Sequence, residues 1–307
     1  MVQENCLKPQ IIIICGPTGS GKSSLAIEVA KLLDTEIVCA DALTVYQELN
    51  VGTAKVTGAE AQGIKHHLID VVTPFDTFSV GDYRDKALPI IDEIISKGKI
   101  PIICGGTGFY INSILYDMSY GNSVANTSAR EKYFDLAKTY GNKYVYEILK
   151  KVDLASAEKL HYNDLKRVVR ALEIYESGHL KSEICDNLTP KYDYKAYSIS
   201  MDREILYNRI NKRVDLMIEN GLVEEVQRLV NMGVSEQNQC LQAIGYKEIY
   251  SYLKNEISLS NAIDLIKLNT RHYAKRQITF FKKLDGLKYI DTEDIKLTAK
   301  NIVGELW

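Results

Sequence analysis

The chain has 307 residues, of which 46% are hydrophobic and 25% charged, a composition typical of a soluble globular protein with one large or two modest domains. No apolar run approaches the ~20 residues of a membrane helix, and the polar start lacks a signal-peptide pattern. We therefore expect a cytoplasmic protein with no membrane segment. The net charge of −2 argues against a general nucleic-acid binder, so any RNA contact requires a local basic patch. Six scattered cysteines without a CxxC pair predict reduced thiols, with neither disulfide nor zinc.

Strands and helices alternate in the first third of the chain. Short β-branched or apolar runs predict strands at 10–15, 36–40, 67–72 and 100–104. Apolar periodicity and capping residues predict helices at 22–33, from Ser79 to about Lys97, and after Gly108 to about Tyr116. This alternation predicts an α/β fold with a parallel sheet covered on both faces, as in a P-loop NTPase-like core.

The pattern changes after residue 120. A polar stretch at 121–128 is predicted to be a linker, and residues 130–177 have helical character without a strand. A strand is expected again at 194–200, followed by a helix capped by Asp202 and a long helix at about 259–281. We therefore predict the first part of the core at 1–120, a helical insertion domain at 121–193, and completion of the core with C-terminal helices at 194–307.

The segment GPTGSGKS at 16–23 fits the phosphate-loop pattern G-x-x-x-x-G-K-S/T, and it lies between a predicted strand and a predicted helix, as the pattern requires. Glycines let backbone N–H groups surround an anion, Lys22 adds a positive charge, and the Ser23 hydroxyl can bind Mg²⁺. The residues expected to contact a diphosphate are Gly16, Pro17, Thr18, Gly19, Ser20, Gly21, Lys22 and Ser23. The loop alone leaves a small-molecule kinase or another NTPase open.

Further motifs follow in a defined order. They are DALTVY at 41–46, VGTAK at 51–55, GIKHHLID at 63–70, PIICGGTGFY at 101–110, NDLKRVVRALE at 163–173, RINKRVDLMIENGLVEEV at 209–226, AIGYKE at 243–248 and TRHYAKRQITFF at 270–281. Together with the phosphate loop, this set resembles the tRNA dimethylallyltransferase family over residues 10–283. The resemblance implies a P-loop core with a helical insertion, and dimethylallyl diphosphate instead of ATP in the loop.

The implied reaction is transfer of the dimethylallyl group to N6 of the adenosine 3′-adjacent to the anticodon in tRNA, with release of diphosphate. Such chemistry needs a base for the amine proton, a stabilised leaving group and a site that excludes water. The target base is expected to be flipped out of its stack. The partners expected are dimethylallyl diphosphate, Mg²⁺ and a tRNA anticodon stem-loop, bound by a monomer.

Asp41 follows a predicted buried strand, so it is expected at the carboxyl edge of the sheet, where α/β proteins bind ligands. Its carboxylate suits capping of the next turn, support of Mg²⁺ or catalysis equally well. The resemblance makes Asp41 the group that takes the amine proton. It also implies that Arg213 reaches the diphosphate and that Thr18 orients the donor or the base. Arg209, one turn before Arg213, is expected to be structural.

Two basic clusters offer local positive charge. One lies on the long C-terminal helix, where residues 264–283 contain six Lys or Arg and one acidic residue, and the other lies on the insertion. From charge alone, each is also compatible with an ordinary solvated helix face, and Thr107 with a turn residue. The resemblance assigns tRNA contacts to Asp41, Ala42, Leu43, Thr44, Thr107, Lys166, Arg167, Arg170, Arg271, Lys275 and Arg276. Phosphate contacts of this kind give salt-dependent affinity.

The sequence departs from the family pattern at a few positions. Ala42 and Thr44 replace the Ser and Gln of D-S-M-Q-V-Y, and Phe280 and Lys282 replace Trp and Arg in the usual Trp-Phe-Arg. No zinc-finger extension follows the last motif, so the chain is expected to resemble the shorter bacterial form of the family.

Three alternatives are a small-molecule kinase, a prenyltransferase that modifies free adenine nucleotides, and a silent RNA-binding descendant. The strand at 100–104 ends in Gly-Gly-Thr instead of an acidic Mg²⁺ ligand, which disfavours a kinase. The basic helix favours tRNA over a free nucleotide, and intact Lys22, Ser23, Asp41 and Arg213 disfavour a silent descendant.

Overall fold

The computed structural model describes residues 8–118, 127–185 and 187–306. Its internal contacts define two compact units, Met1–Leu115 with Pro190–Trp307, and Tyr116–Thr189. Most of the predicted linker at 121–128 lies outside the described residues. The division into domains at 1–120, 121–193 and 194–307 stays a prediction. None of the described helices is long and apolar enough to cross a membrane.

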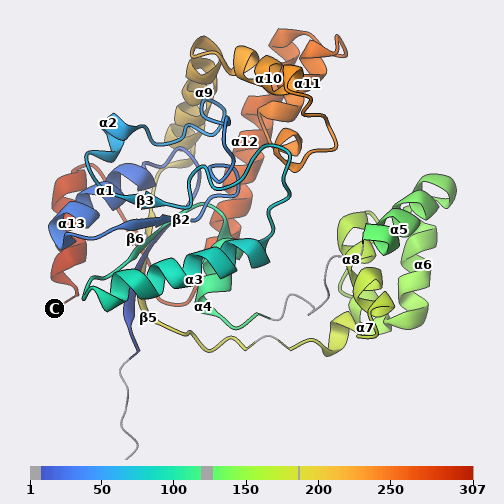
Figure 1. Cartoon of the computed structure of the whole chain (residues 1–307), viewed down its shortest axis with the longest axis horizontal. Coiled ribbons are helices and arrows are strands. Elements are labelled where there is room, and N and C mark those ends of the chain that lie inside the picture. The colour runs from blue at the N-terminus through green and yellow to red at the C-terminus, as the bar shows by residue number, and fades with distance from the viewer. Residues whose placement is uncertain (1–7, 119–126, 186, 307) are drawn as a thin grey trace, which may run out of the picture. The chain divides into compact units, whose positions relative to one another are not determined.

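In the described part of the chain, six parallel strands form one sheet in the order β3-β2-β4-β1-β5-β6 (Figure 1). The strands are β1 (Gln10–Cys15), β2 (Ile37–Cys39), β3 (His66–His67), β4 (Ile102–Gly105), β5 (Asp193–Ile199) and β6 (Leu287–Ile290). The central strand β1 is buried on both faces, which explains its run of four isoleucines. Cys15 pairs with Gly105 on one side and Ser198 on the other, so these strands end level with one another.

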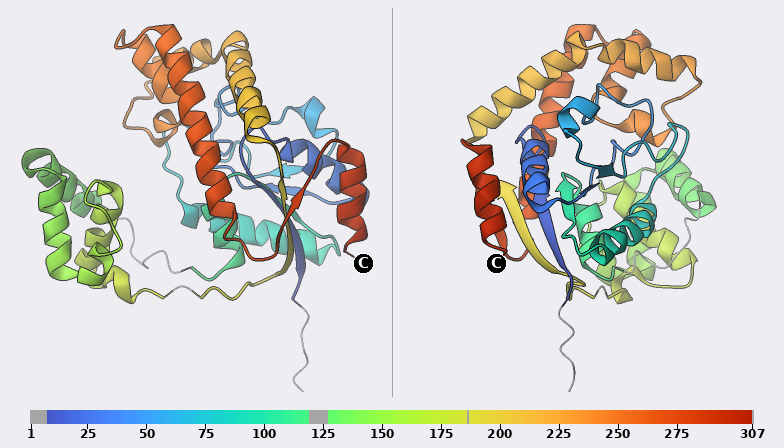
Figure 2. Two further views of the ribbon diagram at one scale, coloured as in Figure 1. Left: turned by 180° about the vertical axis from the view of Figure 1, so that it is seen from behind. Right: turned by 60° about the vertical axis from the view of Figure 1, so that its left-hand side comes forward.

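Helices cover both faces of the sheet (Figure 2). On one face, α1 (Lys22–Leu33) packs against α13 (Ile295–Gly304), and Leu25 and Ile302 share a core with Ile12 and Ile14 of β1. On the other face, α3 (Val80–Ser96) packs against α4 (Gly108–Leu115). Ser79 begins α3 with the expected capping box. The α/β class and parallel sheet predicted from the sequence are therefore confirmed.

The second half of this unit adds helices at the carboxyl edge of the sheet (Figure 1). They are α9 (Arg203–Glu219), α10 (Leu222–Asn231), α11 (Tyr246–Leu253) and α12 (Leu259–Phe281). Asp202 caps α9 by accepting the N–H groups of Glu204 and Ile205. The helices α9 and α11 both pack against α12, while the short α2 (Gly58–Ala61) and a 3₁₀ turn, η2 (Gln239–Gln242), lie in connecting loops.

The unit Tyr116–Thr189 is helical and has a core of its own. Its helices are α5 (Thr127–Tyr140), α6 (Asn142–Val152), α7 (Leu154–Ala157) and α8 (Leu165–Glu176), followed by a 3₁₀ turn, η1 (Lys181–Glu183). Val145, Leu149, Val168 and Leu172 are fully buried between these helices. The carboxylate of Glu173 is also buried, and it pairs with Arg130 and Arg170 at 2.8 Å each.

The predicted strand at 67–72 is wrong beyond its first residue. The strand β3 contains only His66–His67, because Leu68 and Asp70 have positive φ values of 62° and 56° and turn the chain away from the sheet. The Lys55 ammonium holds this turn through Asp70 Oδ1 at 2.6 Å. The edge strand β6 was not predicted, because this end of the chain was expected to be mostly helical.

Candidate active site

The phosphate loop connects β1 to α1 at the carboxyl edge of the sheet. Gly16, Gly19 and Gly21 have φ values of 129°, 79° and 96°, a backbone region that other residues rarely adopt. Gly21 begins α1 without a side-chain cap. The first N–H groups of α1 therefore have no capping side chain, and this positive helix end is suited to an anion.

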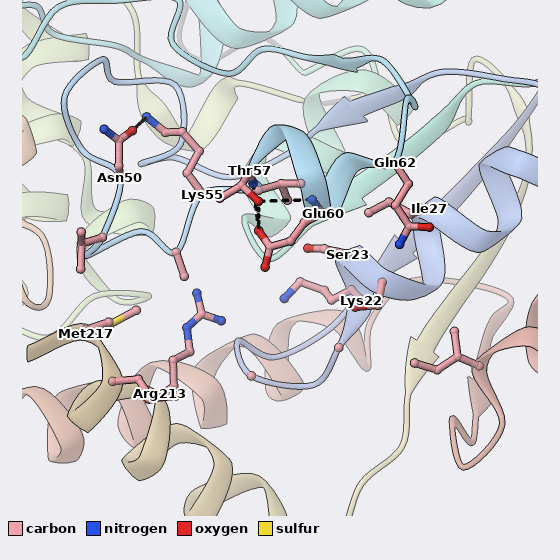
Figure 3. A pocket seen from close by; sticks show the side chains of 18 of the residues that line it. Lys22, Ser23, Ile27, Asn50, Lys55, Thr57, Glu60, Gln62, Arg213 and Met217 are labelled. Carbon is pink, nitrogen blue, oxygen red and sulfur yellow. Dashed lines mark hydrogen bonds between the residues drawn. The ribbon is translucent and has the colours of Figure 1, made fainter. Parts of the chain in front are cut away.

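Two cations converge beside this loop. The Lys22 ammonium donates to the Pro17 carbonyl at 3.0 Å, and the Arg213 guanidinium of α9 donates to the Thr53 carbonyl at 3.1 Å. Figure 3 shows both side chains reaching into the same space. Burial lowers the pKa of Arg213, while loss of hydration and then the Arg213 charge lower the pKa of Lys22. A bound anion would relieve both effects, so the pair is suited to phosphate oxygens.

Asp41 lies directly after β2 and opens a turn. Its Oδ1 accepts the N–H of Leu43 at 2.9 Å and that of Thr44 at 3.4 Å. The Thr107 hydroxyl accepts the N–H of Ala42 at 3.0 Å, which ties this turn to the loop after β4. The capping role considered for Asp41 is thus present. The cap leaves the carboxylate accessible, because Asp41 still lines a cavity.

The two cations and the carboxylate line one cavity of about 440 Å³, here called the Asp41 cavity. Its polar residues include Thr18, Lys22, Asp41 and Arg213. Its apolar wall is formed by Ile210, Val214, Met217, Ile244 and Ile266. Burial, and then the charge of Asp41, raise the pKa of Tyr273, another lining residue, to about 12, so its phenol stays protonated at neutral pH.

A second cavity of about 840 Å³, here called the Ser23 cavity, shares Lys22 and Arg213 with the first (Figure 3). Ser23, Asn50 and Lys55 also line it. Lys22 and Arg213 therefore stand where the two cavities meet. An anion bound between Lys22 and Arg213 would therefore be accessible from both cavities.

Gln277 of α12 connects the phosphate loop to the loop after β4, a role that the sequence did not indicate. Its side chain is 4% exposed. Its Oε1 accepts the N–H of Thr18, and its Nε2 donates to the Gly106 carbonyl, both at 2.9 Å. A Cβ on residue 106 would lie 2.2 Å from this Nε2, so the glycine permits the contact.

Glu225 of α10 was also missed. Its buried carboxylate accepts the N–H groups of Asn50, Val51 and Gly52 at 2.8 to 3.1 Å and the Tyr246 hydroxyl at 2.7 Å. It thereby fixes the loop that leads to Thr53, whose carbonyl binds Arg213. The only sequence signal for it is an acidic residue on the apolar face of a helix.

The basic residues of α12 differ in exposure. Arg271 is half-buried and donates to Asn211 Oδ1 at 2.7 Å. Lys275 and Arg276 are exposed, and Arg276 lines the Asp41 cavity with its guanidinium 5.7 Å from the centre of the Tyr273 ring. Arg209 of α9 is exposed and lines neither cavity. Within the other unit, Lys166 and Arg167 are exposed, whereas Arg170 pairs with buried Glu173.

This fold and site define a P-loop α/β protein in which helices between β5 and β6 complete a cavity with an apolar wall and two cations suited to phosphate oxygens. The IPP transferase family model matches residues 44–284. A tRNA dimethylallyltransferase of Thermoanaerobacter sp. (strain X514) is 50% identical over 97% of both chains, and one of Bacillus cereus (strain ATCC 14579) is 44% identical over 95% of this chain and 93% of that one. The chain therefore belongs to the IPP transferase family.

Solved structures agree with this assignment. The tRNA isopentenylpyrophosphate transferase of Bacillus halodurans superposes with a TM-score of 0.73 at 36% identity, over 97% of both chains. A eukaryotic dimethylallyltransferase acting on tRNA gives a TM-score of 0.79 at 29% identity, over 97% of this chain and 77% of that one. The resemblance stated from sequence motifs is confirmed.

Proposed function

We propose that this protein transfers a dimethylallyl group from dimethylallyl diphosphate to N6 of the adenosine 3′-adjacent to the anticodon of tRNA. The amine nitrogen forms a bond to C1 of the allyl group, the C1–O bond breaks, and the electron pair leaves with diphosphate. One amine proton is lost. The observation that carries this proposal is the convergence of Lys22, Arg213 and Asp41 on one apolar-walled cavity.

The leaving group determines the first requirement. Diphosphate gains negative charge as the C–O bond breaks, so cations already placed beside it stabilise the transition state more than the substrate. Lys22 and the N–H groups of the phosphate loop bind it on one side, and Arg213 on the other. Ile210, Met217 and Ile266 keep water from the allyl carbon, where hydrolysis would compete with transfer.

The amine determines the second requirement. Its lone pair is delocalised into the purine ring, so attack is easier when a base accepts the proton as the new bond forms. Asp41 has one oxygen engaged by the turn that it opens, which fixes the orientation of its carboxylate in the cavity. Asp41 is the proposed base, and Thr18, at the same cavity, helps to orient the reactants.

Mg²⁺ is the proposed cofactor. Ser23 and Asp41 both line a small cavity of about 100 Å³ beside Lys22, so hydroxyl and carboxylate oxygens suited to this ion lie near the diphosphate site. Ser23 would hold the ion together with diphosphate oxygens. When bound, the ion supplies further neutralisation of the leaving group.

The anticodon stem-loop is the proposed acceptor. Arg276 lies at the Asp41 cavity and Lys275 beside it, so phosphates near the target nucleotide have cationic partners. Lys166, Arg167, Arg170 and Arg271 remain proposed contacts, as do Ala42, Leu43, Thr44 and Thr107 around the flipped base. We propose that a monomer in the cytoplasm, where it meets its tRNA, carries out the reaction.

Transfer of label from dimethylallyl diphosphate with Mg²⁺ tests the proposal. Three acceptors are compared: an unmodified anticodon stem-loop RNA with adenosine after the anticodon, AMP, and ATP. Label on the RNA alone is expected and would show that Ala42 and Thr44 are tolerated. Label on AMP or ATP would instead favour an enzyme that modifies free nucleotides. The absence of any transfer would contradict the proposal and favour a small-molecule kinase.

The base is tested separately. Asp41→Ala is expected to lower the single-turnover rate by about 10²–10⁴-fold, the usual contribution of general base catalysis, while tRNA still binds. An unchanged single-turnover rate would remove Asp41 from the mechanism.

A further inference from the structure

Two phenylalanines form an exposed aromatic pair where α4 meets α12. Phe109, in the first turn of α4, is 58% exposed. Its ring centre lies 5.3 Å from that of Phe280, in the last turn of α12, and the ring planes are inclined at 59°. Gly108 makes this contact possible, because a Cβ at that position would lie 2.1 Å from the Phe280 ring.

One ring of the pair packs against a buried side chain, and the other is exposed to solvent. Phe280 also packs edge-on against Phe281, which is 2% exposed, with ring centres 5.7 Å apart. Phe280 therefore contacts the core through Phe281, whereas Phe109 presents more than half of its surface to solvent. An exposed aromatic ring that packs against a second ring is suited to stacking with another flat ring.

Both phenylalanines lie close in sequence to residues that hold the active-site loops. Thr107, two residues before Phe109, holds the turn that Asp41 opens, through the N–H of Ala42. Gln277, three residues before Phe280, binds the N–H of Thr18 in the phosphate loop. Each ring thus lies two or three residues after a side chain that holds a loop of the Asp41 cavity.

The end of α12 that carries Phe280 is basic. Between residues 275 and 283 of the sequence there are four basic residues and no acidic one. Lys275, Arg276, Lys282 and Lys283 are all exposed. Aromatic rings beside exposed cations are typical of surfaces that bind single-stranded nucleic acid, in which bases stack and phosphates pair with the cations.

We propose that Phe109 and Phe280 form a stacking platform for an unstacked anticodon-loop base that neighbours the target adenosine. This inference rests on the proposed function, since it concerns the same RNA substrate. Flipping the target base leaves its neighbours without a stacking partner. The platform supplies a replacement ring surface, and the surrounding cations bind the adjacent phosphates.

The test compares wild type with Phe109→Ala and Phe109→Trp, using Tyr289→Ala as control. Tyr289 is an aromatic residue of similar exposure, 53%, on the edge strand β6. Phe109→Ala is expected to raise the KM for anticodon stem-loop RNA by roughly ten- to a hundredfold, the usual cost of losing one base–aromatic stack. The KM for dimethylallyl diphosphate should not change. Phe109→Trp should retain RNA affinity, and Tyr289→Ala should behave as wild type.

A series of RNAs with one abasic site at each loop position identifies the stacked base. Wild type should lose affinity most strongly at one position beside the target, and Phe109→Ala should be insensitive to the same change. Equal RNA affinity of Phe109→Ala and wild type, or equal sensitivity of both at every position, would overturn the platform, whether the pair binds another protein or nothing. Failure of wild type to prenylate any RNA would instead overturn the proposed function. Thermal melting verifies that each variant is folded.

Discussion

Replacement of Glu225 by glutamine tests how the cavity wall is held. The carboxylate is 1% exposed and accepts four hydrogen bonds, two at Oε2 from Asn50 and Val51 and two at Oε1 from Gly52 and Tyr246. Glutamine has the same shape, but one of its terminal atoms is an NH₂ group. With that group at the Oε1 position, the Gly52 N–H loses its acceptor, and the Tyr246 hydroxyl has to turn and accept from the amide.

The expected loss of free energy of unfolding follows from the hydrogen bonds that the substitution changes. A hydrogen bond to a charged group contributes about 1.5–3 kcal/mol and one to a neutral group about 0.5–1.5 kcal/mol. Loss of the Gly52 bond and weakening of the other three therefore suggest ~3–6 kcal/mol. The neutral amide is less costly to bury than a carboxylate, which offsets part of the loss. We therefore expect Glu225→Gln to lower the free energy of unfolding by about 3 kcal/mol. The KM for dimethylallyl diphosphate should also rise, because the loosened loop carries the Thr53 carbonyl that positions Arg213.

Urea denaturation and steady-state kinetics measure both effects, with Tyr246→Phe as the matched control. That variant removes one hydroxyl from Oε1 and leaves the three backbone bonds, so it should cost about 1–2 kcal/mol and change KM little. An unchanged denaturation midpoint in Glu225→Gln would refute the reasoning. Equal losses in both variants would assign the effect to the tyrosine contact instead of the loop.

Three further predictions concern other contacts. Arg213→Lys should lower kcat/KM for the prenyl donor by about ten- to a hundredfold in steady-state assays, because an ammonium cannot bind two phosphate oxygens in a planar fork; wild-type kinetics would exclude the contact. Gln277→Leu should leave the Thr18 N–H and the Gly106 carbonyl without this partner and lower the free energy of unfolding by about 2–4 kcal/mol in urea, whereas an unchanged midpoint would show that the bridge is dispensable. The hydrogen bond from His67 lowers the pKa of Glu36 from its ordinary 4.5 to about 2, so this contact stabilises the fold above pH 4.5 and is lost as the pH falls toward 2. Between pH 7 and pH 3, wild type should therefore lose more stability than Glu36→Gln, and parallel losses would contradict the linkage.

Much of the fold was predictable from local patterns. The strand Gln10–Cys15 and the helices Lys22–Leu33 and Leu259–Phe281 have the bounds that the sequence predicted. Each has a strong local cause: a continuous apolar run, a glycine before the first turn, or a long periodic helix capped by Ser258. The edge strand β6 was missed because Leu287–Ile290 is short and only half-buried, so it lacks the apolar signal of a central strand.

The site was predictable only in part, for a physical reason. Lys22, Asp41 and Arg213 were named from motifs, and the structure places all three at one cavity, while their roles stay predictions. Gln277 and Glu225 could not be found this way. Their partners lie 259 and 175 residues away along the chain, and periodicity carries no information about such pairs.

The contacts of Gln277, Glu225 and Arg213 share one consequence for how the cavity works. All three side chains belong to α9–α12, and all three bind the backbone of loops that follow core strands. Swinging these helices away would break all of these hydrogen bonds, each of which contributes about 0.5–3 kcal/mol. Movement of these helices away from the core therefore has a free-energy cost, and the contacts hold the wall of the cavity in place. In the proposed reaction, the phosphate loop holds the diphosphate, and the fixed wall places apolar residues beside Asp41, as allyl transfer requires.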